Sequence, residues 1–202
     1  AAAKLASWAV ATWLCEEFEV ACCGRRADVS SGLVACVRKW LRKAAEKQNA
    51  KLKSYACTVV AVAVSEDGRW MAGHIGDGAI IGRFGQILGA LSLPQKGEFA
   101  NETYFVTDQD ATETIRVFGS AFGDGNKPSG FALFCDGLEH ALINRHSAKV
   151  APALGKMLSW LDSYGEDDVT AALQKNVRNV FRDQSGDDCT IALLSNGALL
   201  NP

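Results

Sequence analysis

The sequence lacks a basic stripe, and it has no large excess of charge of either sign. Its formal net charge is −2 over 202 residues. The two basic clusters, Arg25–Arg26 and Arg38–Lys43, fit the solvated faces and ends of predicted helices. Because nucleic-acid-binding domains usually carry a strongly basic face, this charge pattern argues against a nucleic-acid partner.

The sequence also lacks a Cys-x-x-Cys pair. Its cysteines are odd in number and fall mostly within apolar runs, at positions 15, 22, 23, 36, 57, 135 and 189. A disulfide framework or a zinc site would need paired spacings. The pattern is typical of reduced core cysteines, and it predicts a cytoplasmic protein.

No hydrophobic run is long enough to cross a membrane. The largely apolar stretch Leu5–Cys15 is followed at once by Glu16, Glu17 and Glu19, so it predicts neither a signal peptide nor a membrane partner. Internal repeats, low-complexity segments and linkers are absent as well. The length and apolar content therefore predict one globular domain over residues 1–202.

Apolar periodicity predicts helices at the two ends of the chain, with many strands between them. Helices are expected within 5–15, 33–44, 152–161 and 169–181, with Ser30 or Ser31 as the N-cap of the second. Strands are expected at 55–64, 70–75, 79–84, 87–91, 104–107, 114–118, 131–135 and 189–194. This order favours the α+β class, with antiparallel sheets covered by helices. Two sheets stacked face to face would explain why Tyr55–Val64 is apolar on both faces.

Three aspartates flank strand-like runs at glycine-containing turns: Asp77, Asp136 and Asp187. Acidic residues are disfavoured within strands, and glycine lets the backbone approach an ion closely. Carboxylate oxygens at strand ends suggest a site for a hard cation such as Mg²⁺ or Mn²⁺. Each motif taken singly is also explained by a simple turn, since Asp-Gly is a common hairpin dipeptide.

Taken together and in this order, the motifs resemble those of the PPM-type (protein phosphatase 2C-like) metal-dependent serine/threonine phosphatases, most closely the compact bacterial branch. The resemblance rests on Gly76–Asp77, Asp136–Gly137 and Asp187–Thr190, and on the stretches at 55–58 and 97–108. It runs over nearly the whole chain and implies a four-layer α-β-β-α sandwich of two antiparallel sheets flanked by helix pairs.

The resemblance implies hydrolysis of phosphoserine or phosphothreonine in a protein substrate by a metal-activated water, with two or three Mn²⁺ or Mg²⁺ ions. It assigns Asp136 and Asp187 to one ion of a pair, and Asp77 with Asp136 to a third, weaker site. Further residues are expected to support these ligands or to line the cleft: Gly76, Gly137, Asp188, Asn101 and Thr103. His74, two residues before a turn, is expected to pack rather than to act as a general acid.

The chain departs from the family pattern at three places. Gly-Asp-Ser-Arg is replaced by Gly76–Ala79, and the Asp-Asn pair by Asp187–Asp188. The family's first strands, with an Asn-x-Asp motif and an Asp-Gly-x-Gly turn whose aspartate bridges two metals, have no counterpart. Ala1–Leu5 resembles the helix that follows them. The resemblance therefore implies that the first strands are missing from this chain, which by itself would have little activity.

Two other functions compete with hydrolysis of phosphoproteins. A phosphatase-like module could bind a phosphoprotein or a partner domain without turnover, which the missing bridging aspartate favours. N-terminal-nucleophile hydrolases share the four-layer architecture, but they need a terminal Thr, Ser or Cys, and this chain begins with Ala1.

Overall fold

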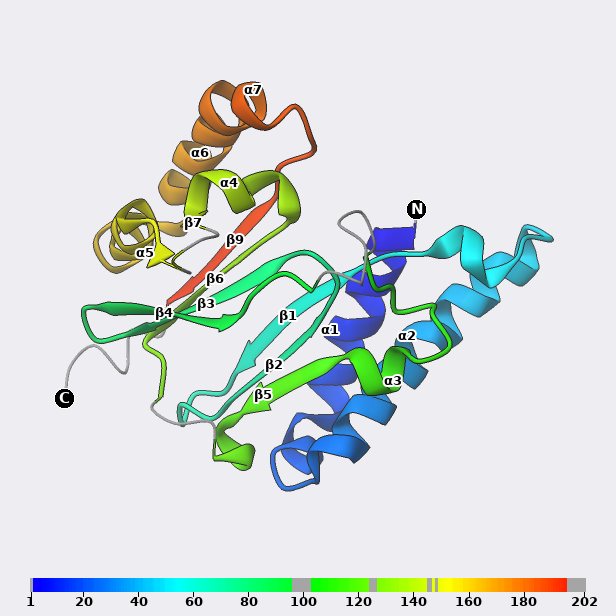
Figure 1. Ribbon diagram of the computed structural model, residues 1–202. Coiled ribbons are helices and arrows are strands. Elements are labelled where there is room, and N and C mark those ends of the chain that lie inside the picture. The colour runs from blue at the N-terminus through cyan, green and yellow to red at the C-terminus, as the bar shows by residue number, and fades with distance from the viewer. Residues whose placement is uncertain (1, 96–102, 124–126, 145–146, 148, 196–202) are drawn as a thin grey trace. The chain divides into compact units, whose positions relative to one another are not determined.

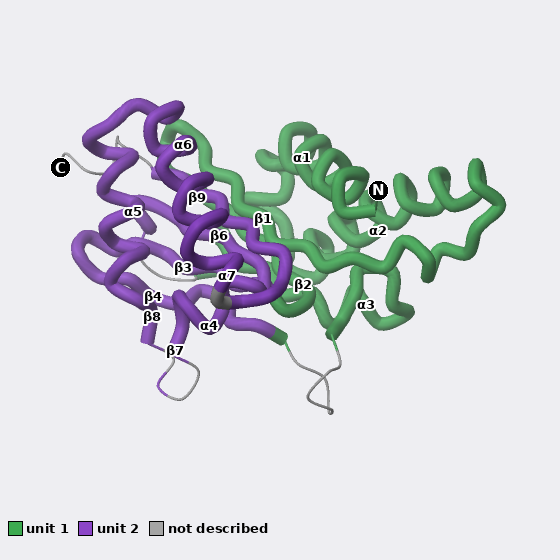
Figure 2. The backbone as a smooth tube through the Cα atoms, turned by 90° about the horizontal axis from the view of Figure 1, so that it is seen from above, with its two compact units in different colours: residues 1–77, 95–125 green, residues 78–94, 126–202 purple. Residues whose placement is uncertain are grey.

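The computed structural model describes residues 2–95, 103–123, 127–144, 147 and 149–195 (Figure 1). The chain divides into two compact units that interleave in sequence (Figure 2). Unit 1 comprises residues 1–77 and 95–125, and unit 2 comprises residues 78–94 and 126–202. Each unit combines an antiparallel sheet with helices, so the predicted α+β class is confirmed.

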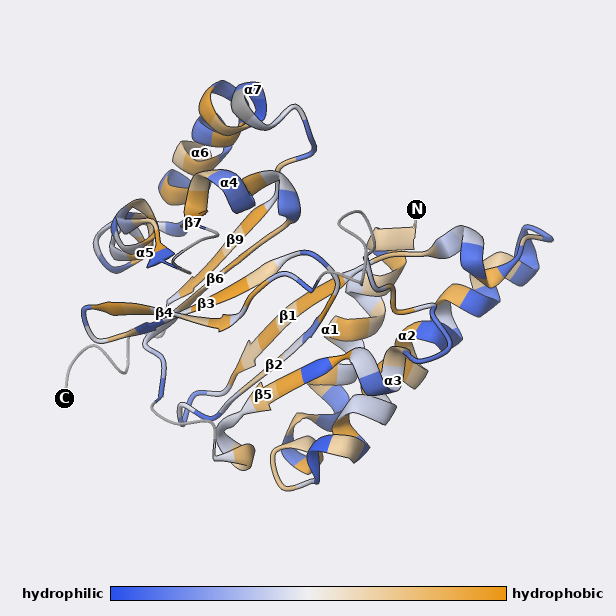
Figure 3. Ribbon diagram, in the orientation of Figure 1, coloured by the Kyte–Doolittle hydropathy of each residue, from blue (hydrophilic) through white to orange (hydrophobic). Residues whose placement is uncertain are grey.

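Unit 1 is a three-stranded sheet of order β1-β2-β5, packed against two long helices. All pairs are antiparallel, with Val59 opposite Ile75 and His74 opposite Arg116. The elements are α1 (Ala2–Ala21), α2 (Arg26–Lys47), η1 (Leu52–Tyr55), β1 (Val59–Val64), β2 (Trp70–Ile75), α3 (Ala111–Thr114), β5 (Arg116–Gly119) and η2 (Ser120–Phe122). Figure 3 shows that the strands are largely hydrophobic, whereas the helices alternate between the two colours. This alternation is typical of helices that cover one face of a sheet.

Both N-terminal helices are confirmed, but the predicted N-cap of the second is wrong. Helix α2 begins at Arg26, and Ser30 is a buried residue within it. The extra turn is stabilised by Asp28, because its carboxylate pairs with the Arg25 guanidinium at 2.8 Å and lies in the first turn of the helix.

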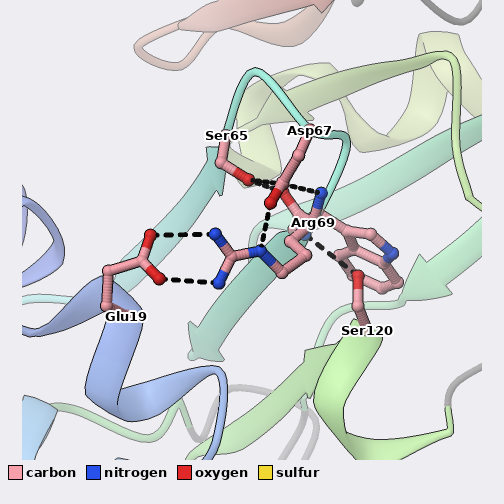
Figure 4. Close-up of polar contacts among 6 residues, drawn as sticks. Glu19, Ser65, Asp67, Arg69 and Ser120 are labelled. Atoms are coloured by element: carbon pink, nitrogen blue, oxygen red, sulfur yellow. Dashed lines mark hydrogen bonds and ion pairs between the residues drawn. The ribbon is translucent and has the colours of Figure 1, made fainter.

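The β1–β2 hairpin turns at Asp67–Gly68, as predicted, and Arg69 ties it to the end of α1 (Figure 4). The Arg69 guanidinium donates to both oxygens of Glu19, at 2.7 and 3.0 Å, and through Nε to Asp67. The hydroxyl of Ser65 and then the backbone N–H of Arg69 lower the pKa of Asp67 to about 2. The carboxylate is therefore charged whenever the hairpin is folded near neutral pH.

Three predicted strands of unit 1 are wrong in whole or in part. Residues 55–58 precede β1, because Tyr55 lies in η1 and its hydroxyl donates to the Ala44 carbonyl of α2. Residues 104–107 form no strand, since the Phe105 N–H donates to Asp108 in a local turn. Strand β5 begins at Arg116 rather than at position 114, after the short helix α3.

Unit 2 is a four-stranded antiparallel sheet of order β4-β3-β6-β9 with helices packed on it. The elements are β3 (Ala79–Phe84), β4 (Ile87–Ser92), β6 (Gly130–Phe134), η3 (Asp136–Leu138), α4 (Glu139–Leu142), β7 (Ile143–Asn144), β8 (Lys149–Val150), α5 (Pro152–Ser163), α6 (Glu166–Asn176), the π-helical turn η4 (Val177–Phe181), α7 (Arg182–Ser185) and β9 (Ile191–Ser195). The predicted strands and helices of this unit are confirmed to within a few residues. Pairing of β6 with β9, Phe134 opposite Ile191, brings the last strand beside the strand that precedes Asp136.

A buried guanidinium fixes one end of the β6–β9 pair. Arg83, on β3, makes a two-pronged ion pair with Asp162 of α5, and its side chain is 8% exposed. The same guanidinium donates to Ser129, just before β6, and to the Ser195 hydroxyl at the end of β9. Through one side chain it therefore joins β3, α5, β6 and β9.

No helix among the described residues is long and apolar enough to span a membrane. All seven cysteines lie within the described part of the chain, and none of them forms a disulfide. The cysteines are therefore present as thiols, but the expectation that they lie in the core is wrong for most of them: Cys57 is buried, whereas Cys15 and Cys23 are exposed and the other four are half-buried.

The ion pair of Arg83 leads to a first prediction. Replacing Asp162 by Asn should destabilise the protein by about 3 kcal/mol, because a buried guanidinium would lose its compensating charge. The double variant Arg83→Met with Asp162→Leu should recover much of that loss, since no buried charge remains. Urea unfolding of the three proteins measures both effects, and equal losses in the single and double variants would contradict the explanation.

A second prediction concerns His74, whose side chain is fully buried on β2. Burial, and then the positive charge of Arg116, lower the pKa of His74 to about 4. The imidazole is thus neutral in the folded protein but becomes protonated in the unfolded chain below its ordinary pKa of about 6.5. The stability that depends on a neutral His74 is therefore fully present above pH 6.5. It is lost progressively as the pH falls from about 6.5 toward 4.

Between pH 7.5 and pH 5, this linkage should cost the wild type about 2 kcal/mol of unfolding free energy. His74→Gln keeps an acceptor for Arg116 but does not titrate, so its stability should fall less over the same interval. The measurement is urea unfolding at the two pH values. Parallel losses in the two proteins would show that His74 does not cause the acid sensitivity.

Candidate functional site

The turn that carries Asp77 belongs to unit 1 and follows β2 directly. Asp77 is half-buried, and its Oδ2 accepts a hydrogen bond of 2.9 Å from the Thr103 hydroxyl. Thr103, which the sequence places near the ligands, thus contacts Asp77, and a role of either residue at a metal site stays a prediction. Asn101, the other predicted cleft residue, lies outside the described residues.

Gly76 shapes this turn, as no other residue could. Its φ is +113°, and a Cβ added there would lie 2.3 Å from the Thr58 methyl carbon. The Gln95 side chain then fixes the turn, because its Oε1 accepts from the Gly76 N–H at 2.9 Å and its Nε2 donates to the Thr114 carbonyl at 2.8 Å. Gln95 was not predicted from the sequence, where it sits in an irregular stretch without a recognisable motif.

The Asp136 turn belongs to unit 2 and follows β6. Asp136 begins the short helix η3, and its exposed carboxylate accepts from the Gly137 N–H at 2.9 Å. A Cβ added to Gly137 would lie 2.4 Å from the Asp188 carbonyl oxygen. Glycine is therefore required for close approach between this turn and the next one, and not only for the turn itself.

The second turn of unit 2 carries Asp187 and Asp188 and precedes β9. Gly186, with φ of +69°, ends α7, and the Asp187 N–H then donates to the Ser185 hydroxyl. Asp187 is exposed, and its Oδ1 accepts from the Asp188 N–H at 2.7 Å. Two acidic turns thus meet at one end of the β6–β9 pair.

Two thiols accompany these turns, and the sequence interpretation had treated both as core cysteines. Cys135 and Cys189 are half-buried and stand directly beside Asp136 and Asp188 in the chain. Burial raises the pKa of the Cys135 thiol, which keeps its proton and can donate. The adjacency of a cysteine to each acidic motif is visible in the sequence, but it does not show that either thiol contacts the other turn.

The carboxylate oxygens of Asp136 and Asp187 are ligands suited to Mg²⁺ or Mn²⁺, and the turns leave both side chains exposed. The structure therefore brings together two of the three predicted ligand turns. Within the described residues, no group of three or more His, Cys, Asp or Glu side chains is arranged to hold a metal. Because Asp77 belongs to unit 1, its participation in the same centre stays a prediction.

Comparison with known proteins gives matches in sequence. The profile of the family described as "Protein phosphatase 2C" matches residues 1–178. Serine/threonine-protein phosphatase 3 of Escherichia coli (strain K12) is 32% identical over 116 residues. That alignment covers 57% of this chain and 44% of the relative, so the chain matches less than half of the relative's length.

Solved structures give matches in fold. A crystal structure of a bacterial serine phosphatase superposes with a TM-score of 0.51 at 15% identity. The match covers 81% of this chain and 66% of that one, and a mutant of a bacterial serine phosphatase gives the same values. At this level of identity, the likeness concerns the fold alone, and it supports the predicted α+β sandwich.

The close approach of the two turns in unit 2 leads to a third prediction. Gly137→Ala should lower the unfolding free energy by about 1–3 kcal/mol, because the added methyl would push against the Asp188 backbone. Gly155→Ala is the matched control: this glycine lies within α5, and its added Cβ would meet nothing nearer than 3.6 Å. It should be neutral or stabilise by up to about 1 kcal/mol. Thermal unfolding separates the two, and similar midpoints would contradict the prediction.

Proposed function

The chain belongs to the protein phosphatase 2C family, and from that membership we propose that it acts as a metal-dependent serine/threonine phosphatase. The substrate would be a phosphorylated protein, and the cations would be Mn²⁺ or Mg²⁺. A cytoplasmic location agrees with seven cysteines that form no disulfide. The observation that carries the proposal is the meeting of the Asp136 and Asp187 turns in a chain that matches this family.

The residues present fit a divalent cation by their chemistry. Asp136 and Asp187 would supply anionic oxygens, while Asp77, supported by Thr103, would supply another from unit 1. Bound divalent cations lower the pKa of coordinated water and offset the charge of a phosphoryl group. The role of the chain is to hold these carboxylates in place. Gly76 makes that possible by letting its turn approach the Thr58 side chain, and Gly137 by letting its turn approach the Asp188 backbone.

Three side chains that could act in catalysis take no such role in the proposed reaction. The thiols of Cys135 and Cys189 donate toward backbone oxygens, so they take no part as nucleophiles in the proposal. His74 is buried and neutral near pH 7, as its lowered pKa indicates. Water, rather than one of these three side chains, would then attack phosphorus, and no phospho-enzyme would form.

A phosphatase-like module that binds without turnover is the alternative. The two functions differ in a direct assay. Release of inorganic phosphate from a phosphoserine peptide supports hydrolysis, whereas binding of the same peptide without release supports the alternative.

The proposed role of Asp136 leads to a fourth prediction. In a chain extended through the family's first strands, Asp136→Ala should reduce Mn²⁺-dependent hydrolysis of a phosphoserine peptide by at least about a hundredfold, because Asp136 is assigned to two of the metal positions. Stability without metal should be unchanged or slightly higher, since one of several neighbouring like charges is removed.

The matched control is Asp167→Ala, which removes an exposed carboxylate from the first turn of α6 in the same unit. It should leave hydrolysis near the wild-type rate. Isothermal titration with Mn²⁺ gives a second measurement that does not depend on turnover. Wild-type rates and wild-type Mn²⁺ affinity in Asp136→Ala would show that the site assignment is wrong.

A further inference from the structure

The thiol of Cys135 reaches from the first acidic turn of unit 2 to the second. Its Sγ lies 3.1 Å from the Asp188 carbonyl oxygen, to which it donates. The same sulfur accepts from the Thr190 N–H, also at 3.1 Å. One side chain therefore contacts the backbone on both sides of Cys189, in the loop that carries Asp187.

The thiol of Cys189 makes the reverse contact. Its Sγ lies 3.5 Å from the Gly137 carbonyl oxygen in the first turn and 3.5 Å from the Asp187 carbonyl oxygen in its own turn. Each acidic turn thus contributes one thiol that reaches the other. A cysteine thiol is suited to both roles, because it is a weak donor as well as a weak acceptor.

These contacts lie where the sheet stops holding the two segments together. The β6–β9 ladder ends with Phe134 opposite Ile191, and the Cys135 N–H then donates to the Thr190 carbonyl at 3.2 Å. Beyond that bond, the turns carry Asp136, Asp187 and Asp188, whose like charges favour separation. A further connection is needed there to keep the turns at a fixed spacing.

We propose that Cys135 and Cys189 are positioning residues that brace the Asp136 and Asp187 turns against each other. The brace sets how the two carboxylates are presented to a divalent cation, and in this sense the inference rests on the proposed function. The brace itself concerns only the spacing between the backbones of the Asp136 turn and the Asp187 turn. It can therefore be measured without catalysis.

Four variants separate a bracing role from simple packing. Cys135→Ala removes the donor and acceptor, and Cys135→Val fills the site with a slightly larger apolar side chain that also lacks them. Cys135→Ser retains both functions, and Cys189→Ala tests the reverse contact. Cys36→Ala is the control, because the Cys36 thiol also contacts a backbone carbonyl, that of Ala9 at 3.6 Å, but lies in unit 1.

The primary measurement is residue-resolved amide hydrogen exchange of Thr190, whose N–H is bonded to the Cys135 sulfur. Exchange should be about two- to fivefold faster in Cys135→Ala and Cys135→Val, since a weak hydrogen bond to sulfur is lost. It should return toward the wild-type rate in Cys135→Ser and be unchanged in Cys36→Ala. The apparent Mn²⁺ dissociation constant from titration should rise severalfold in the same variants whose exchange is faster, and in Cys189→Ala.

Wild-type exchange in Cys135→Ala, or full restoration by Cys135→Val, would overturn the brace and leave only a packing role. Should Cys135→Ala fail to fold, Cys189→Ala provides the decision: wild-type Mn²⁺ affinity in that variant would refute the brace. If the phosphatase proposal were wrong and the brace correct, the measurements would give a different result. The protein would then release no phosphate, while the exchange rates of the variants would still differ as described.

Discussion

The candidate site depends on the backbone pairing of β6 with β9. This ladder brings together segments more than fifty residues apart, and a slip of one residue would turn every side chain of β9 to the opposite face. Its two ends are held by different chemistry. At one end the Arg83 guanidinium binds Ser129 and Ser195, and at the other Cys135 contacts the loop before β9. The acidic turns are therefore attached to a strand pair whose register is fixed twice.

The same principle appears in unit 1 with other residues. There the turn before Asp77 is held by an amide side chain, Gln95, instead of by thiols. In both units glycine permits a backbone approach that any Cβ would prevent, and polar contacts to backbone then hold the acidic turn in place. Carboxylates are thus placed just past strand ends, where acidic residues do not disturb a ladder. This arrangement explains how a chain with only ordinary turn dipeptides can present carboxylate oxygens next to the ends of its strands.

The sequence predicted the elements with strong periodicity and the acidic turns, because both depend on local residues. Helices α1 and α5 and strands β2, β3 and β6 are confirmed on that basis. The prediction for 55–58 failed because a tertiary contact decided there, since the Tyr55 hydroxyl bonds α2. The prediction for 104–107 failed because a local turn formed instead, in which the Phe105 N–H bonds Asp108. Like Tyr55, Gln95 and the two thiols act across distant segments, which no local pattern reveals. Asp187 could be recognised as an acidic turn residue, whereas the neighbour that braces it could not.

The interleaving of the two units has a consequence for the order in which the protein is made. Strands β3 and β4 form a hairpin early in synthesis, but the next partner of β3 is β6, which begins only at Gly130. At common rates of translation, the β3 edge waits roughly a few seconds for that strand. During this interval its open edge can pair with other nascent chains. The insertion of residues 95–125 between the hairpin and its partner therefore makes unit 2 vulnerable during synthesis, when unit 1 is already nearly complete.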